Sequence, residues 1–449
     1  MNTRRDAAID AVRALAIAGV VIGHWLVTAL VVGDDGALHV HSPLAALPAA
    51  QPVSWLLQTL GLFFLAGGYA AAVSSARRSR QPATPTSGPE ASRAPGGEPQ
   101  GVPRAPARSR ALTARGTGTG GRRKLRVPRR LVILLIPVGS LLGLLALALT
   151  AGALAGVPEE TLRTVGKLVV SPLWFLLPFL ALTALVTPIA RLVRRFGPVP
   201  LAAGATAVVL AADLGHGFLP TTLIAAWTVP FVLGVALAHG RLGQRRRTGW
   251  LLLVGGAAAV VALVGFADYP ASAVGVPGEG RSNLDPPSLA AIALAVAQAG
   301  AVLLLMPWLR RLGGHRAVRA LNGAALPVYL WHQATMISVT VALAWFVGRR
   351  PGLLAEPDDY GWAAARLAWL PLFAAALVLV VRIAGARSAA GQPARPIRTV
   401  GGQPSGQCRA AGSRVIESPL VRVPGRRLEV IAVRDSDPPS RSRAAVRSR

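Results

Sequence analysis

The chain has 449 residues, of which 52% are hydrophobic, and it carries a formal net charge of +29. A soluble fold could not bury that much apolar surface beside 48 Lys and Arg residues unless the two were segregated along the chain. They are segregated, because apolar runs of about 20 residues, long enough to span a bilayer, alternate with short Arg-rich connectors. In lipid the backbone must satisfy its own hydrogen bonds, so these runs are expected to be helices. The composition therefore predicts an all-α, polytopic integral membrane protein whose partner is the lipid bilayer.

Two other classes of protein are excluded by the same observations. The arginines punctuate the apolar runs and crowd into two Pro/Gly/Ser-rich segments, which argues against binding to nucleic acid. Cys408 is the single cysteine, so an intrachain disulfide, a CxxC redox pair and a cysteine-based zinc site are all excluded. The first apolar run is too long for the core of a signal peptide and is expected to be a retained first span.

The apolar runs predict about ten membrane-spanning helices. They are expected near residues 9–32, 53–75, 131–155, 171–190, 199–215, 221–239, 249–267, 289–308, 323–347 and 363–383. Prolines interrupt the fourth to sixth runs, which membrane helices tolerate when neighbouring groups satisfy the freed backbone.

The distribution of Lys and Arg predicts the orientation of these spans. With ten spans, both termini lie on the same side, which then holds 41 Lys and Arg residues against 6 on the other side. Basic residues concentrate on the cytoplasmic side of membrane proteins. We therefore expect a multi-pass protein of the plasma membrane with cytoplasmic N- and C-termini.

Four stretches of sequence differ in composition. We expect the first two spans in residues 1–76, a disordered Pro/Arg-rich cytoplasmic insertion in 77–124, eight further spans of the same domain in 125–384, and a disordered basic tail in 385–449. The insertion and the tail have too few apolar residues to offset the entropy of ordering. An alternative role for both is attraction to anionic lipid.

Ionisable residues within a span are hypotheses of function. The first span contains Asp10, Arg13 and His24. Arg13 and His24 are 11 residues apart, which places them on nearly the same face of a helix and roughly 16 Å apart along its axis. Arg13 could instead reach the interface and pair with Asp10, and His24 could be a hydrogen-bonding residue between helices.

A second intramembrane histidine, His332, lies in the ninth span in the segment LPVYLWHQ, which also contains Tyr329. Two histidines and an arginine, with little acid nearby, suggest a base combined with an anion-recognition group. Their spacing does not fit a metal site.

Four segments carry a resemblance to a known family. They are IDAVRALAIAGVVIGHW, LFFLAGGYAAAVS, SPLWFLLPFLALTALVTP and ALPVYLWHQ, and they occur in order over residues 9 to about 383. The chain resembles the acyltransferase-3 family of membrane-bound acyltransferases, particularly its actinobacterial-type members. The Arg13–His24 spacing matches the family's R-x10-H pattern, and Trp174 lies in its Leu-Trp-Phe-Leu segment.

The resemblance implies an O-acyltransferase that transfers an acyl group, expected to be acetyl, from acyl-CoA to a hydroxyl of a glycan, lipid-linked saccharide or secondary metabolite. It implies that His24 is catalytic and Arg13 its essential partner, with His332, Tyr329, Trp174 and Asp10 in supporting roles. No bound cofactor is expected, since acyl-CoA would be a substrate.

Two features depart from the family pattern. Ala66, Gly67 and Gly68 stand where many relatives have a serine, so a serine nucleophile is not expected there. Arg126 and Arg129 match an Arg-x-x-Arg motif of the family only by spacing, and with Arg130 they are candidate donor-binding residues.

Transport is a second function that fits ten spans with ionisable residues inside the membrane. A transporter or flippase for small molecules or lipid-linked saccharides could line its path with Arg13, His24 and His332. Such proteins commonly contain inverted repeats, and no internal repeat is visible in this sequence.

Overall fold

The computed structural model describes residues 6–78, 129–216, 219–243 and 245–390. Within these ranges ten helices are long and apolar enough to cross a membrane. They are Ala7–Val27, Pro48–Arg78, Ile136–Leu154, Glu159–Ala184, Val199–His216, Pro220–Ala238, Arg245–Phe266, Leu289–Gly313, Ala325–Val347 and Tyr360–Ala384. The predicted all-α, multi-pass membrane fold is confirmed. Arg126, nearly all of the predicted insertion and most of the predicted tail lie outside the described residues.

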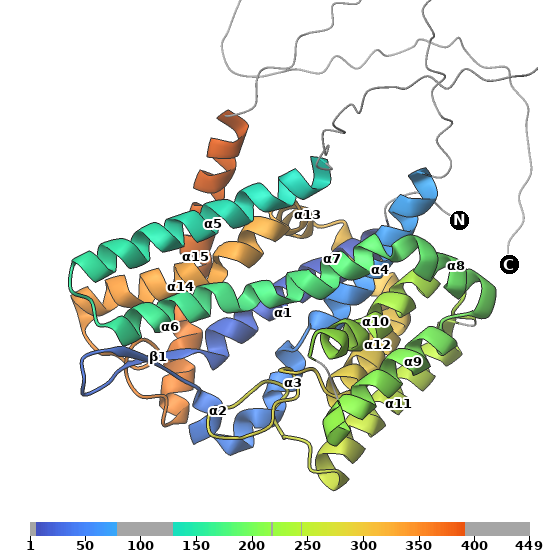
Figure 1. Ribbon diagram of the computed structural model, residues 1–449, viewed down its shortest axis with the longest axis horizontal. Helices are drawn as coiled ribbons and strands as arrows, with labels where there is room; N and C mark the ends of the chain where they lie inside the picture. The colour runs from blue at the N-terminus through green and yellow to red at the C-terminus, as the bar shows by residue number, and fades with distance from the viewer. Residues whose placement is uncertain (1–5, 79–128, 217–218, 244, 391–449) are drawn as a thin grey trace, which may run out of the picture. The chain divides into compact units, whose positions relative to one another are not determined.

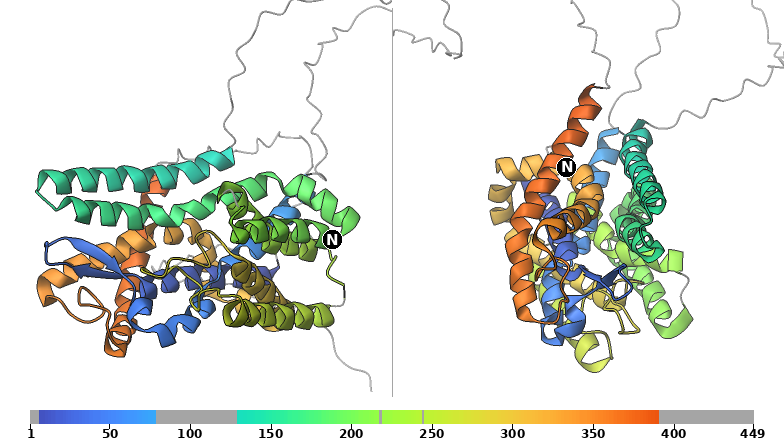
Figure 2. Two further views of the ribbon diagram at one scale, coloured as in Figure 1. Left: turned by 60° about the horizontal axis from the view of Figure 1, so that its bottom comes forward. Right: turned by 90° about the vertical axis from the view of Figure 1, so that its left-hand side faces the viewer.

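Figures 1 and 2 show how the elements are arranged. In chain order they are α1 (Ala7–Val27), β1 (Ala29–Val32), β2 (Leu38–His41), α2 (Pro43–Ala46), η1 (Pro48–Val53), α3 (Ser54–Leu57), α4 (Leu60–Arg78), α5 (Arg129–Leu154), α6 (Glu159–Val170), η2 (Ser171–Phe175), α7 (Leu176–Ala184), α8 (Val186–Phe196), α9 (Val199–Ala211), η3 (Ala212–His216), α10 (Leu219–Ala238), α11 (Arg245–Phe266), α12 (Leu289–Gly313), α13 (Arg316–Gly323), α14 (Ala325–Val347) and α15 (Tyr360–Ala390).

Helix α1 is shorter than the sequence predicts. It begins after Asp6, whose side chain accepts a hydrogen bond from the Ala8 amide, and it ends at Val27 instead of residue 32. Residues Ala29–Val32 form an antiparallel pair with Leu38–His41. This stretch contains β-branched valines, which favour a strand, and an apolar run alone cannot distinguish a strand from the end of a helix.

The fourth span also differs from its prediction of residues 171–190. It runs from Glu159 to Ala184 and combines α6, the tight turn η2 and α7. Residues 186–190 belong instead to α8, an amphipathic helix that buries Val186, Ile189 and Val193 and carries arginines in its last turn. The predicted start of the span was wrong because α6 begins with charged residues, Glu159 and Glu160, so its first turns do not stand out as apolar.

Close packing of helices fixes the position of α4. A methyl group added at Gly68 would overlap the carbonyl group of Phe231 in α10, and one at Gly234 would overlap the carbonyl group of Leu65 in α4. Small residues of this kind let membrane helices approach backbone to backbone. Gly68 therefore serves the close packing of α4 against α10.

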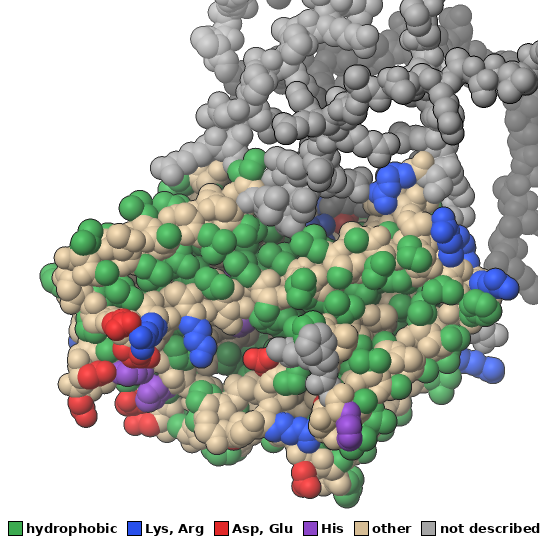
Figure 3. Space-filling model, in the orientation of Figure 1, with side chains coloured by type: hydrophobic (Ala, Val, Ile, Leu, Met, Phe, Trp, Pro, Cys, Tyr) green, Lys and Arg blue, Asp and Glu red, His purple; other side chains and the backbone are tan. Residues whose placement is uncertain are grey.

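Charged side chains gather at opposite ends of the helices. Exposed Asp and Glu residues lie near the β1–β2 hairpin and the loop before α15, whereas exposed arginines lie near α8 (Figure 3). We call the end that carries α8 and Arg78 the arginine face and the end that carries the hairpin the hairpin face. That the arginine face is cytoplasmic stays a prediction.

The loop between α11 and α12, residues 267–288, is tied to the hairpin face by a carboxylate. Asp213 Oδ2 accepts hydrogen bonds from the Tyr269 hydroxyl at 2.6 Å and from the Leu289 amide at 2.9 Å. The guanidinium of Arg281 lies 4.4 Å from the centre of the Tyr269 ring. Burial and the hydrogen bond to Asp213 raise the pKa of Tyr269 to about 12.

We predict that Tyr269 ionises well above the ordinary tyrosine pKa of about 10. Because folding favours its protonated form, its contribution to stability is present below pH 10 and is lost as the pH approaches about 12. The difference between ultraviolet titrations of the wild type and Tyr269→Phe measures this group, and Asp213→Ala should lower its midpoint. A midpoint near 10 in the folded wild type would contradict the prediction.

Candidate active site

Two histidines from helices far apart in sequence meet inside the bundle. His24 Nδ1 in α1 lies 2.9 Å from His332 Nε2 in α14. Their ring centres are 5.0 Å apart and the ring planes differ by 19°. His332 is fully buried, and His24 is partly buried against a cavity. The structure therefore joins two of the residues that the sequence singled out separately.

The hydrogen bonds around this pair assign the position of each proton. His332 Nδ1 lies 2.6 Å from the carbonyl oxygen of Tyr329. A carbonyl oxygen can only accept, so in the neutral pair His332 carries its proton on Nδ1 and has a lone pair on Nε2. His24 Nδ1 must then donate to His332 Nε2, which leaves the lone pair of His24 on Nε2. The Nε2 atom of His24 can thus accept a hydrogen bond or a proton.

The end of α1 is held by a buried cation. Arg366 in α15 is 0% exposed and donates to the carbonyl oxygens of Trp25, Gly352 and Thr28, each at 2.7 Å. These include carbonyl groups at the end of a helix, which lack partners within the helix. In the same region the indole of Trp25 donates to the carbonyl oxygen of His332 at 3.0 Å. Arg366 and Trp25 together fix the turn that carries His24.

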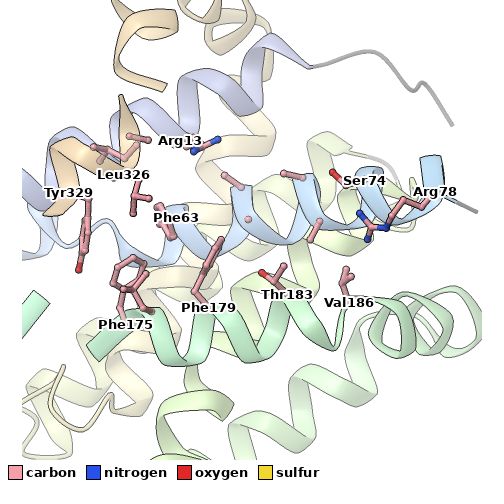
Figure 4. A pocket seen from close by; sticks show the side chains of 17 residues that line it. Arg13, Phe63, Ser74, Arg78, Phe175, Phe179, Thr183, Val186, Leu326 and Tyr329 are labelled. Carbon is pink, nitrogen blue, oxygen red and sulfur yellow. The ribbon is translucent and has the colours of Figure 1, made fainter. Parts of the chain in front are cut away.

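A cavity of about 390 Å³ opens toward the arginine face. We call it the inner cavity. Arg13 and Arg78 line it together with Ser74, and most of its remaining wall is aliphatic or aromatic (Figure 4). Figure 4 shows Arg78 and Ser74 at one end of this cavity, Phe175 and Tyr329 at the other, and Arg13 between them. The cavity therefore combines cationic groups with an apolar interior.

A smaller cavity of about 70 Å³ is lined by His24, and we call it the outer cavity. Gln58, Trp174 and two residues of the 267–288 loop, Val274 and Leu284, also line it. His24 therefore borders a cavity whose wall includes a loop of the hairpin face.

Two aromatic residues line both cavities and separate them. The rings of Phe175, in η2, and Tyr329, in α14, have centres 4.4 Å apart. The Tyr329 hydroxyl donates to the carbonyl oxygen of Pro172, which ties η2 to α14. The two cavities therefore adjoin at this aromatic pair.

The other residues predicted from sequence fall into three groups. Trp174 lines the outer cavity, and its supporting role stays a prediction. Asp10 lies outside both cavities, and its carbonyl oxygen accepts a hydrogen bond from Asn322 at 2.7 Å. Arg129 and Arg130 begin α5, but their side chains, like Arg126, lie outside what the structure describes.

Three residues of this region were not predicted as site residues. Arg366 is one of the six Lys and Arg residues that the charge distribution assigns to the outer side, yet it is buried at the end of α1. Phe175 lies in the Leu-Trp-Phe-Leu segment, but its apolar side chain suggests no chemical role, and Gln58 lies in a turn. The position of Arg366 within the span predicted over residues 363–383 was the one available hint.

The fold and this site define a multi-pass membrane protein with a hydrogen-bonded pair of histidines near an arginine-lined cavity and a second, smaller cavity. The sequence profile of the acyltransferase-3 domain, described as an acyltransferase domain, matches residues 112–386, more than half of the chain. The chain belongs to the acyltransferase-3 family and is a membrane acyltransferase. Comparisons with curated proteins and with solved structures gave no match.

The matched range contains only part of the candidate site. It includes Trp174, Tyr329 and His332, whereas Arg13 and His24 precede it. The contact between His24 and His332 therefore connects the matched segment to the helix that carries the R-x10-H pattern.

We predict that Arg366→Met lowers the free energy of unfolding by about 3 kcal/mol or more, because three carbonyl oxygens lose a charged donor. Arg366→Lys should be intermediate, since an ammonium group cannot reproduce the planar fork of donors. Thermal unfolding of the full chain in detergent measures both. Arg350→Met, at an exposed arginine near the same face, is the control and should change stability little. Equal stability of Arg366→Met and Arg350→Met would contradict the assignment.

Proposed function

We propose that the protein transfers an acyl group, acetyl in the simplest case, from acyl-CoA to a hydroxyl group of a glycan, lipid-linked saccharide or secondary metabolite. The observation that carries this proposal is the hydrogen-bond chain from Tyr329 through His332 to His24, which leaves His24 Nε2 as a base beside the outer cavity. Family membership supplies the reaction class, and the two cavities supply separate routes for donor and acceptor.

In the proposed reaction His24 Nε2 accepts the proton of the acceptor hydroxyl as its oxygen attacks the thioester carbonyl. General-base assistance of this kind contributes about 10²–10⁴-fold to the rate. The His24 Nδ1–H group donates to His332 Nε2 throughout, which holds the ring in place while it becomes positively charged. An alternative route, in which His24 itself first accepts the acyl group, would use the same lone pair.

The inner cavity suits the donor. Guanidinium groups recognise phosphate in a bidentate manner, and Arg13 and Arg78 lie in this cavity. Its apolar walls would accommodate the uncharged arm that carries the thioester. Arg126, Arg129 and Arg130 are proposed to add positive charge for the CoA phosphates. The aromatic pair Phe175 and Tyr329 must then shift to let the thioester approach His24.

The outer cavity suits part of an acceptor. Its 70 Å³ is well below the roughly 300–1,000 Å³ of typical small-molecule sites, so it can admit a hydroxyl-bearing arm but not a whole saccharide. The rest of the acceptor would rest on the hairpin face, near loop 267–288. We propose that this face is extracytoplasmic, that the protein lies in the plasma membrane and that both termini are cytoplasmic.

A transporter or flippase is the competing function. Family membership favours the acyltransferase, and the two functions differ in a simple product. Acyl transfer releases the CoA thiol, whereas transport does not. Membranes that contain the full chain, supplied with acetyl-CoA and candidate acceptors, can be tested for thiol release with a thiol reagent.

We predict that His24→Ala lowers acceptor-dependent thiol release by about 10²–10⁴-fold, because the base is removed. His332→Ala should give a smaller loss, because it removes the acceptor that fixes the ring of His24. The control is His315→Ala, an exposed histidine outside both cavities. Full activity of correctly folded His24→Ala would show that His24 is not the base.

We predict that Arg78→Ala raises the KM for acetyl-CoA about tenfold, equivalent to about 1.4 kcal/mol of binding, with little change in kcat. The physical reason is the loss of one charged contact to the donor, which is present both before and during the reaction. Arg195→Ala removes an exposed arginine of the same face outside the cavity and should leave the KM unchanged. A fall in kcat at an unchanged KM would argue against donor binding by Arg78.

A further inference from the structure

Besides His24, the outer cavity is lined by a polar side chain whose amide can donate hydrogen bonds. Gln58 lies between α3 and α4, is 7% exposed and lines this cavity. Its neighbour Thr59 donates to the carbonyl oxygen of Ala16 at 2.8 Å, and a methyl group at Gly19 would collide with the Thr59 side chain. The turn that carries Gln58 is therefore pressed against the helix that carries His24.

The side-chain amide of Gln58 has a fixed orientation. Its Oε1 accepts a hydrogen bond from the Leu60 amide at 3.1 Å, and its backbone carbonyl accepts one from Gln298 Nε2 at 2.6 Å. Because a backbone N–H can only donate, Oε1 must face Leu60, and Nε2 must face the other way. Within the described part of the chain, Gln58 Nε2 is buried and has no hydrogen-bond partner.

A buried donor without a partner destabilises a fold by roughly 1–3 kcal/mol and calls for an explanation. Two other polar groups of the same cavity, the hydroxyls of Ser54 and Tyr329, already have partners. The Ser54 hydroxyl donates to the carbonyl oxygen of Gln51 and accepts from the Ala273 amide, and the Tyr329 hydroxyl donates to the carbonyl oxygen of Pro172. The amide of Gln58 is thus held in position with its N–H groups uncommitted.

We propose that Gln58 Nε2 donates a hydrogen bond to the thioester carbonyl oxygen and stabilises the negative charge that develops on it. This inference rests on the proposed acyl transfer. As the acceptor oxygen forms its bond to the carbonyl carbon, its proton passes to His24 Nε2 and the carbonyl electron pair moves onto the oxygen. The carbon–sulfur bond then breaks, the carbonyl re-forms, and the thiolate of CoA takes the proton from His24.

The fixed position of the Gln58 amide explains how it would stabilise the negative charge. A fixed donor that already points to the place where charge develops needs no reorganisation during the reaction, and loss of one such donor typically lowers kcat by about 10²–10³-fold. The donor is a neutral amide, so it adds no charge beside His24 that would disfavour proton uptake by the base.

The test compares two substitutions of Gln58. Gln58→Glu retains an oxygen that can accept from the Leu60 amide but removes the NH₂ donor, so it separates the structural contact from the proposed catalytic one. Gln58→Met removes both at a similar size. The matched control is Thr340→Val, which removes a buried hydroxyl in α14 that also lacks a partner in the described structure and lies outside both cavities.

Kinetics of thiol release with acetyl-CoA are measured for each variant, alongside thermal unfolding of the full chain. We expect Gln58→Glu and Gln58→Met to lose about 10²–10³-fold in kcat, with KM values for donor and acceptor near those of the wild type and of Thr340→Val. Folded variants with unchanged kcat would overturn the proposal, as would a rise only in the KM for the acceptor, which would make Gln58 an acceptor-binding residue. A wild-type chain that releases no thiol would overturn the proposed function itself.

Discussion

The site depends on one hydrogen-bonded line that runs from the carbonyl oxygen of Tyr329 through His332 to His24. A backbone carbonyl can only accept, and that single fact sets the tautomer of both imidazoles in the neutral pair. The line also joins α1 to α14, so the ring of His24 is positioned by contacts between helices. Trp25 and Arg366 reinforce the same junction from the side of the hairpin face. The same set of contacts therefore fixes the protons of the two histidines, the packing of α1 against α14 and the end of α1.

This junction lies between two cavities of different character. The inner cavity has two arginines and apolar walls, and the outer cavity is lined by His24 and Gln58. A CoA ester carries several negative charges and cannot cross lipid, whereas its thioester arm is uncharged. On the proposed account the protein lets only that arm reach the base, past Phe175 and Tyr329. The membrane then separates donor from acceptor, and the acyl group alone passes between them.

The sequence predicted the helical membrane fold because long apolar runs have few alternatives in lipid. It also placed Arg13 and His24 on one stripe of α1, and the structure puts them at different cavities along that helix. It could not predict the contact between His24 and His332, which are 308 residues apart, because such pairing depends on how helices pack. It was wrong about the end of α1, where valines pair as a strand, and about the start of the fourth span, where acidic residues precede the apolar face.

Gln58 and Arg366 show a further limit of sequence reasoning. Glutamine in a turn carries no signal of a role in the sequence. The proposed role depends on knowing both that Oε1 accepts from the Leu60 amide and that Nε2 is buried without a hydrogen-bond partner in the described structure. Arg366 resembles an interfacial charge in the sequence, and its burial becomes understandable only beside the carbonyl oxygens at the end of α1.

The central claim is that donor and acceptor reach His24 from opposite faces of the membrane. The most direct test uses proteoliposomes of known orientation, with labelled acetyl-CoA supplied on one side and a hydroxyl-bearing acceptor confined to the other. The account predicts labelled acceptor only when acetyl-CoA is supplied at the arginine face, with Arg13 and Arg78, and the acceptor is at the hairpin face. Labelling only when donor and acceptor share one side would contradict it.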